Sequence, residues 1–125
     1  MILIKISDSY WIELTPEQLI SIYFGQITIR MNLDDFHTMA SMFDLSMGND
    51  MPDEKICSVY LQEDGNYKVT YRAFSMSLCQ YALNRFAELC AMGVMQLEYH
   101  NKQNKQKHFK TAKKWRHLSV VPSSR

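Results

Sequence analysis

The chain has 125 residues, a length that fits one domain with a modest core of its own. Apolar residues make up 46% and charged residues 22%, which is typical of a globular protein and argues against disorder of the whole chain. The longest apolar runs are too short to cross a bilayer, and the N-terminus lacks the pattern of a secretory signal. We therefore expect a cytoplasmic protein that does not bind membranes.

The charged residues are segregated along the chain. Residues 1–100 contain six basic and thirteen acidic residues, a charge of −7, whereas residues 101–125 contain eight basic and no acidic residues, a charge of +8. This division predicts a compact acidic body over residues 1–100 and a basic C-terminal extension over residues 101–125, partly packed on the body. Such an extension is expected to dock on a negative surface.

Alternating apolar residues predict two strands near the start of the chain, over residues 10–14 and 20–31. The second strand is expected to bend or bulge at Gly25, because a glycine weakens a strand interior. Residues 15–18 between the strands fit either a turn or a short helix, since Thr15 and Gln18 have the spacing of a capping box and Pro16 fits the first helical position.

A helix is predicted to follow Asn32 and to end before Gly48. Asn32 can cap its N-terminus, and Asp34 and Asp35 occupy the first turn, where the helix dipole favours negative charge. Apolar residues then recur at intervals of three and four and define a buried stripe. This stripe consists of Leu33, Phe36, Ala40 and Phe43. Residues 46–55 have the composition of a loop.

The next segment predicts strands over residues 56–62 and 67–76, joined by a turn at Asp64-Gly65, which is a strong hairpin signal. A second helix is expected to start with a capping box formed by Ser77 and Gln80 and to stop at Gly93.

An internal repeat is suggested by sliding the chain by about 47 residues, which superimposes the apolar positions of residues 10–45 on those of residues 56–92. Each half would then be a strand–strand–helix unit. A chance match of two similar patterns is the alternative.

The chain is predicted to end in a hairpin. Residues 94–100 alternate and predict a strand, residues 101–107 are polar and predict a loop, and residues 115–121 predict a final strand. The fold class is therefore expected to be α+β, a mainly antiparallel sheet with two helices on one face and a C-terminal hairpin carrying the basic extension. Two separately packed sheets are the alternative.

Residues with catalytic or metal-binding chemistry form no recognisable motif. The three cysteines and four histidines lack the close pairs of a zinc site, and an odd number of cysteines without a secretory signal indicates reduced thiols. The four glycines are isolated, which excludes a Gly-rich phosphate loop. We expect no catalytic residue, no metal and no cofactor.

The basic extension provides the candidate binding residues. Lysines and an arginine can neutralise phosphates or carboxylates, and the aromatic rings among them can stack on unpaired bases. The candidates are Lys107, Phe109, Lys110, Lys113, Lys114, Trp115 and Arg116. The expected partner is an acidic protein or RNA/ssDNA, although the extension can also lie on its own acidic body. The alternative is a subunit of a larger assembly or a homodimer that binds through a sheet edge or Met-rich helix faces.

Overall fold

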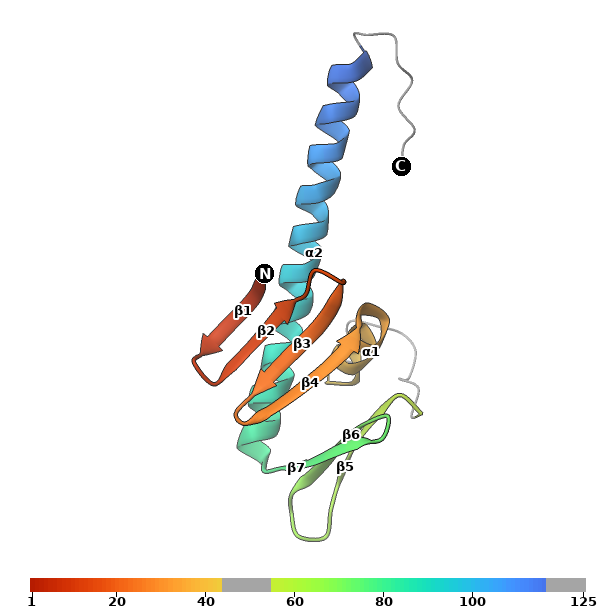
Figure 1. Cartoon of the computed structure of the whole chain (residues 1–125). Coiled ribbons are helices and arrows are strands. Elements are labelled where there is room, and N and C mark those ends of the chain that lie inside the picture. Colours follow the sequence, from red (N-terminus) through yellow and green to blue (C-terminus); the bar gives the residue numbers. More distant parts are fainter. Residues whose placement is uncertain (44–54, 117–125) are drawn as a thin grey trace. The chain divides into compact units, whose positions relative to one another are not determined.

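The structure is a computed structural model that describes residues 1–43 and 55–116, with only the backbone described over residues 104–116 (Figure 1). The described residues form two helices and two antiparallel sheets, so the α+β class is confirmed. The two sheets correspond to the alternative arrangement rather than to the expected single sheet. The strands are β1 (Ile2–Ser7), β2 (Tyr10–Leu14), β3 (Leu19–Phe24), β4 (Ile27–Asn32), β5 (Cys57–Leu61), β6 (Tyr67–Tyr71) and β7 (Phe74–Leu78).

The first sheet is a four-stranded meander in the order β1-β2-β3-β4 (Figure 1). The single strand predicted over residues 20–31 is wrong, because the chain reverses at Gly25, whose φ is +66°, and returns as β4. A positive φ at the first turn position suits a tight hairpin and favours glycine. Residues 15–18 form a turn, in which the Leu19 N–H donates to Thr15 Oγ1 at 3.0 Å.

Strand β1 is an addition to the predicted elements. It pairs antiparallel with β2, but the register shifts between Ile2 and Ile4 and again between Lys5 and Ser7. These irregularities disturb the alternation by which a strand is recognised in a sequence.

The second sheet is a three-stranded meander in the order β5-β6-β7. The predicted Asp64-Gly65 turn is confirmed, with Gly65 at a φ of +90°. The single strand predicted over residues 67–76 is wrong, because the chain reverses at Arg72 and Ala73 to form β7. Arg72 has a φ of +52°, which is unusual for a residue other than glycine.

Helix α1 (Leu33–Phe43) begins where the sequence predicts. The backbone N–H of Asp35 donates to Asn32 Oδ1 at 2.7 Å, so the predicted N-cap is confirmed. Phe36 and Ala40 of the predicted stripe are buried, while Leu33 and Phe43 are half-buried. The predicted loop over residues 46–55 lies outside the described residues, apart from Lys55.

Helix α2 (Gln80–Arg116) is much longer than predicted. The capping box is wrong because Ser77 belongs to β7 and donates its hydroxyl to Gln62 Oε1 at 3.0 Å. The predicted stop at Gly93 is also wrong, since the helix continues through it. A Cβ at position 93 would lie 2.8 Å from Ile12 Cδ1 and 2.9 Å from Phe36 Cζ. Gly93 therefore allows α2 to approach β2 and α1 closely.

The predicted C-terminal hairpin is wrong over its described part. Residues 94–100, 101–107 and 115–116 all belong to α2 instead of forming a strand, a loop and the start of another strand. Residues 117–121 of the predicted final strand lie outside the described residues.

The core is formed where α2 and α1 meet the first sheet. The Phe86 ring packs edge-on against Phe24, with ring centroids 5.2 Å apart, and against Phe43 at 5.7 Å. Ile12 and Ile22 face each other across β2 and β3 and are fully buried. Burial of such side chains provides the main stabilisation of the fold.

The two sheets repeat the same arrangement along the chain. β2 and β5 begin at residues 10 and 57, β4 and β7 at residues 27 and 74, and α1 and α2 at residues 33 and 80, so each pair is separated by 47 residues. The registers match as well: Ile22 pairs with Ile29, and Val69 pairs with Met76. Descent of the two halves from one repeated unit stays a prediction.

The chain divides into two compact units, Met1–Val94 and the part that starts at Met95. Both sheets, α1 and the beginning of α2 belong to the first unit. The boundary predicted between residues 100 and 101 stays a prediction.

Candidate binding surfaces

The basic segment proposed from the sequence lies within α2. All seven candidates fall on the helical backbone that ends at Arg116. Positions 102, 105, 109, 113 and 116 recur at intervals of three and four residues, so they share one face of the helix. This face carries Lys102, Lys105, Phe109, Lys113 and Arg116. Three of the seven candidates lie on this face, namely Phe109, Lys113 and Arg116. Lys107 and Lys114 occupy another side of the helix, and Lys110 and Trp115 lie between these two sides.

A second surface consists of large apolar residues exposed on α2. Met92, Met95 and Tyr99 recur at intervals of three and four residues, with 36%, 64% and 61% of their surfaces exposed. Tyr81 is 68% exposed, and Arg85, one helical turn later, lies 5.7 Å from its ring centroid. Exposed Met and Tyr side chains grouped on one element are typical of protein contact surfaces.

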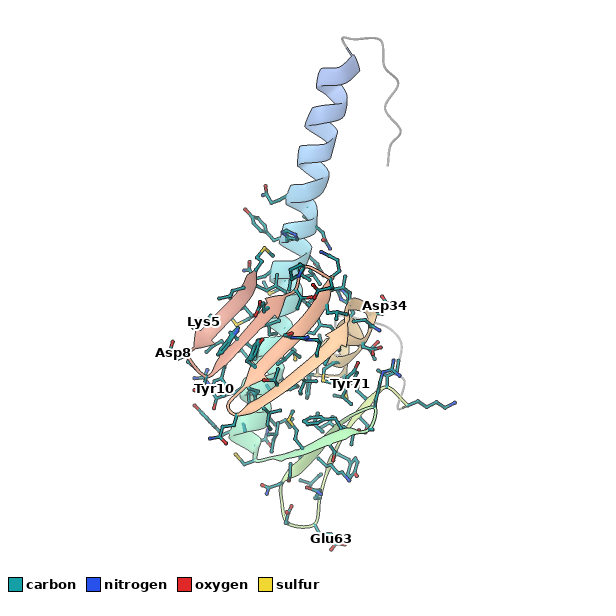
Figure 2. All side chains as sticks on the ribbon, in the orientation of Figure 1. Lys5, Asp8, Tyr10, Asp34, Glu63 and Tyr71 are labelled. Atoms are coloured by element: carbon teal, nitrogen blue, oxygen red, sulfur yellow. The ribbon has the colours of Figure 1, made fainter. Side chains whose placement is uncertain are left out.

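The most elaborate polar cluster surrounds Asp35, which is only 3% exposed. Its carboxylate accepts hydrogen bonds from Tyr71 Oη at 2.6 Å and from Arg72 Nε at 3.0 Å, both on Oδ2. Arg72 Nη2 also donates to Oδ1 at 3.1 Å. Figure 2 labels Tyr71 on the second sheet and Asp34, the neighbour of Asp35, on α1. The cluster thus joins the β6–β7 turn to the first turn of α1.

These contacts set the protonation behaviour of Tyr71. Its pKa is raised above the ordinary value of 10.0, mainly because burial disfavours the phenolate and also because Tyr71 donates to the Asp35 carboxylate. The hydrogen bonds that the Arg72 guanidinium makes with Tyr71 and with the Asp35 carboxylate raise the pKa of Arg72, so the guanidinium stays charged. Both carboxylate oxygens are already engaged, so the cluster acts as a structural link.

The Asp35 cluster is not among the features predicted from the sequence. In the sequence, Asp35 resembles any acidic residue in the first turn of a helix, and Arg72 lies 37 residues farther along the chain. One signal was available: Arg72 is a basic residue between two alternating apolar segments, which indicates an exposed turn. Nothing in the sequence, however, indicates that Arg72 contacts Asp35.

The outer face of the first sheet carries a row of aromatic and basic side chains. The rings of Trp11 and Tyr23 stack across β2 and β3 with centroids 4.3 Å apart, and Lys5 Nζ lies 5.7 Å from the Trp11 ring centroid. Lys5 of β1 also forms an ion pair at 3.3 Å with Asp8, which lies in the β1–β2 turn (Figure 2). Because the rings stack on each other, they stabilise the strand pairing.

The three cysteines differ in their exposure to solvent. Cys57 and Cys90 are buried, and burial raises the pKa of Cys90 far above the ordinary value, which keeps it a neutral thiol. Cys79 is exposed and immediately precedes α2. Within residues 1–43 and 55–116, no group of three or more His, Cys, Asp or Glu side chains is placed to hold a metal ion.

Neither helix of the described chain combines the length and apolar character needed to cross a bilayer. Comparison of the chain with protein-family models, with curated proteins and with solved structures found no match in any of the three.

Proposed function

We propose that this protein is a non-enzymatic cytoplasmic binding module whose basic segment, residues 102–116, docks on a polyanionic macromolecule. The partner is an acidic protein surface or RNA/ssDNA. The observation that carries the proposal is the charge distribution: residues 101–125 contain eight basic and no acidic residues, and the backbone is helical as far as Arg116.

A helical backbone gives the basic residues a regular spacing. Positions 102 to 116 span about 21 Å along the helix axis. Basic residues on such a face can neutralise a row of phosphates or carboxylates, and each contact with a phosphate releases counterions. The position of Phe109 on the same face suits stacking or apolar anchoring.

The test is charge reversal with a matched control. The triple variant Lys113→Glu, Lys114→Glu, Arg116→Glu should lose binding, whereas Lys113→Arg, Lys114→Arg, Arg116→Lys keeps the charge and should keep it. Binding is measured by fluorescence anisotropy to single-stranded RNA and, separately, to poly-glutamate. The logarithm of the binding constant for the RNA should fall linearly with the logarithm of the salt concentration. Equal binding by both triple variants would contradict the proposal.

The acidic body is a competing partner within the chain. Residues 1–100 carry −7 and the extension carries +8, so the extension can be bound by its own body. In that case, charge reversal should strengthen, rather than weaken, binding of the protein to a basic probe such as poly-lysine.

The second candidate function is a structural or regulatory subunit of a larger assembly. The exposed Met95 and Tyr99 favour it, because they lie one helical turn apart on α2 and both present apolar surface to solvent. Such an interface should hardly respond to salt, unlike binding through the basic segment. Met95→Glu should abolish it and leave binding to RNA and poly-glutamate unchanged.

A further inference from the structure

The outer edge of β5 displays backbone groups that no described strand pairs. Gln62 N–H donates to the Asn66 carbonyl at 2.8 Å, and Arg72 N–H donates to the Ile56 carbonyl at 2.7 Å. Because hydrogen-bonded pairs alternate along an antiparallel ladder, Ser58 and Tyr60 direct their backbone groups toward β6. The N–H and carbonyl groups of Val59 and Leu61 therefore point away from β6, at the edge of the sheet.

The sequence of β5 lacks the charged residues and proline that normally prevent strand pairing at a sheet edge. The sequence of β5, Cys-Ser-Val-Tyr-Leu, contains no charge and no proline, and Tyr60 and Leu61 are 50% and 61% exposed. By contrast, the edge strands of the first sheet carry Lys5 in β1 and Arg30 in β4. An uncharged edge strand with exposed apolar side chains is a template for another strand.

The first half of the chain shows how this edge is covered. The strand that corresponds to β5 at the 47-residue spacing is β2, and the outer edge of β2 is paired with β1. There Ile12 pairs with Ile4, and Glu13 pairs with Ile2. In the described chain, β5 has no strand equivalent to β1.

We propose that β5 pairs antiparallel with β5 of a second copy of this chain, about a two-fold axis that passes beside Tyr60. In this register, Val59 exchanges both backbone hydrogen bonds with Leu61 of the second copy, and Tyr60 faces its own counterpart in a pair without hydrogen bonds. The proposal is independent of the function proposed for the basic segment.

The edge is self-complementary in this register, which is the reason for choosing a second copy as the partner. Apolar Val59 meets apolar Leu61 on one face, and the two Tyr60 rings meet on the other. Glu63, at the tip of the β5–β6 hairpin (Figure 2), comes toward the start of the second copy's β5 at Cys57. No like charges are brought opposite each other.

The register is tested by cross-linking the full chain. In a Cys79→Ser background, Tyr60→Cys places two thiols opposite each other, with Cα atoms about 4.5 Å apart, within the range of a disulfide. Mild oxidation should give a covalent dimer. Ser77→Cys in the same background is the control, because Ser77 is exposed but lies on β7, two strands from the pairing edge. Cross-linking at position 77 as efficient as at position 60 would overturn the proposal.

The backbone bonds are tested by proline substitution. Leu61→Pro removes an N–H that points outward and leaves the β5–β6 ladder intact, so the protein should stay folded by circular dichroism. Its dimer should dissociate at least about tenfold more readily in sedimentation equilibrium, because two bonds are lost per dimer. Tyr60→Lys should weaken the dimer as well by placing like charges opposite each other. A monomeric parent chain across the concentration range, or dimers unaffected by either variant, would overturn the proposal.

Discussion

Gly93 has no room for a side chain. It lies inside a helix, where alanine is ordinarily preferred by about 1 kcal/mol, yet a Cβ there would lie within 3 Å of Ile12 and Phe36 side-chain atoms. We expect Gly93→Ala to lower the free energy of unfolding by about 1–3 kcal/mol, because the fully buried side chains of Ile12 and Phe36 must shift to make room for the added methyl group. Urea denaturation of the folded chain measures this change.

The control separates helix propensity from packing. Asn84 is exposed on the same helix, and Asn84→Ala and Asn84→Gly both lose its hydrogen bond with Gln80. Their difference in stability gives the local advantage of alanine over glycine, which should favour alanine. A Gly93→Ala variant that is stabilised by a similar amount would show that the close approach at position 93 is absent in solution.

Tyr71 should make stability depend on alkaline pH. Its pKa is raised in the folded chain, so between pH 10 and the folded-state value the unfolded chain has lost the phenolic proton while the folded chain keeps it. The contribution of this group is therefore present in full below about pH 10 and is lost as the pH rises through the folded pKa. We expect the stability difference between the parent and Tyr71→Phe to shrink over that interval.

Thermal unfolding of both proteins at a series of pH values from 8 to 12 measures the effect. At neutral pH, Tyr71→Phe should be less stable by about 1–2 kcal/mol, because it loses the hydrogen bond to the Asp35 carboxylate. Tyr60→Phe is a suitable control, since it removes the hydroxyl of a tyrosine that is 50% exposed on β5. A constant difference between parent and Tyr71→Phe across pH 8–12 would exclude the mechanism.

At the level of the elements, the hairpins that the sequence analysis merged into single strands had a detectable signal. Buried apolar residues in the first hairpin fall at even positions, such as Ile20 and Ile22, and then at odd positions, such as Ile29 and Met31. A change of parity is what a two-residue turn produces, because the returning strand places the paired residue on the same face. The strands after β1 and the α+β class were predictable because alternation is a local property.

The C-terminal part of α2 was not predictable in the same way. Residues 94–100 alternate, and Gly93 resembles a helix stop, so local rules favoured a strand. What overrides them is packing: Gly93 is needed where α2 contacts Ile12 and Phe36, and those contacts are remote in sequence. The candidate binding residues stay a prediction, and their helical backbone was not predicted. The Asp35 cluster depends on the β6–β7 turn, which the predicted single strand over residues 67–76 did not contain.

Helical structure in the basic segment can be tested separately from its charge. Gln103→Pro removes a backbone donor within α2 and should break the helix near that position, because its ring clashes with the preceding turn. We expect a loss of ellipticity at 222 nm and weaker binding to RNA or poly-glutamate, although the charge is unchanged.

Gln103→Ala is the matched control, because Gln103 is exposed and alanine maintains the helix. It should bind like the parent chain. If Gln103→Pro also binds like the parent while losing ellipticity, the basic segment acts through its charge alone, and the shared helical face is not required.

For the whole molecule, the central fact is that both sheets lie within one compact unit, Met1–Val94. Each sheet has its own hairpins and a matching register, so the two could in principle unfold separately. The Asp35 cluster opposes this, because it fastens the β6–β7 turn to α1, and α1 packs by Phe43 on Phe86 of α2. We therefore expect the two sheets to unfold in a single cooperative transition.

Val69→Ala tests this cooperativity. Val69 is 1% exposed at the centre of the second sheet, and its truncation should lower the free energy of unfolding by about 1–3 kcal/mol.

Trp11 lies in the first sheet and serves as a remote fluorescent probe once Trp115 is replaced by phenylalanine. If unfolding is cooperative, the urea midpoint reported by Trp11 falls together with the midpoint from circular dichroism. If the sheets are independent, the Trp11 midpoint stays at its parent value while the circular dichroism transition becomes biphasic. Ile22→Ala, at the equivalent position of the first sheet, should lower the Trp11 midpoint in either case, so it establishes that the probe responds.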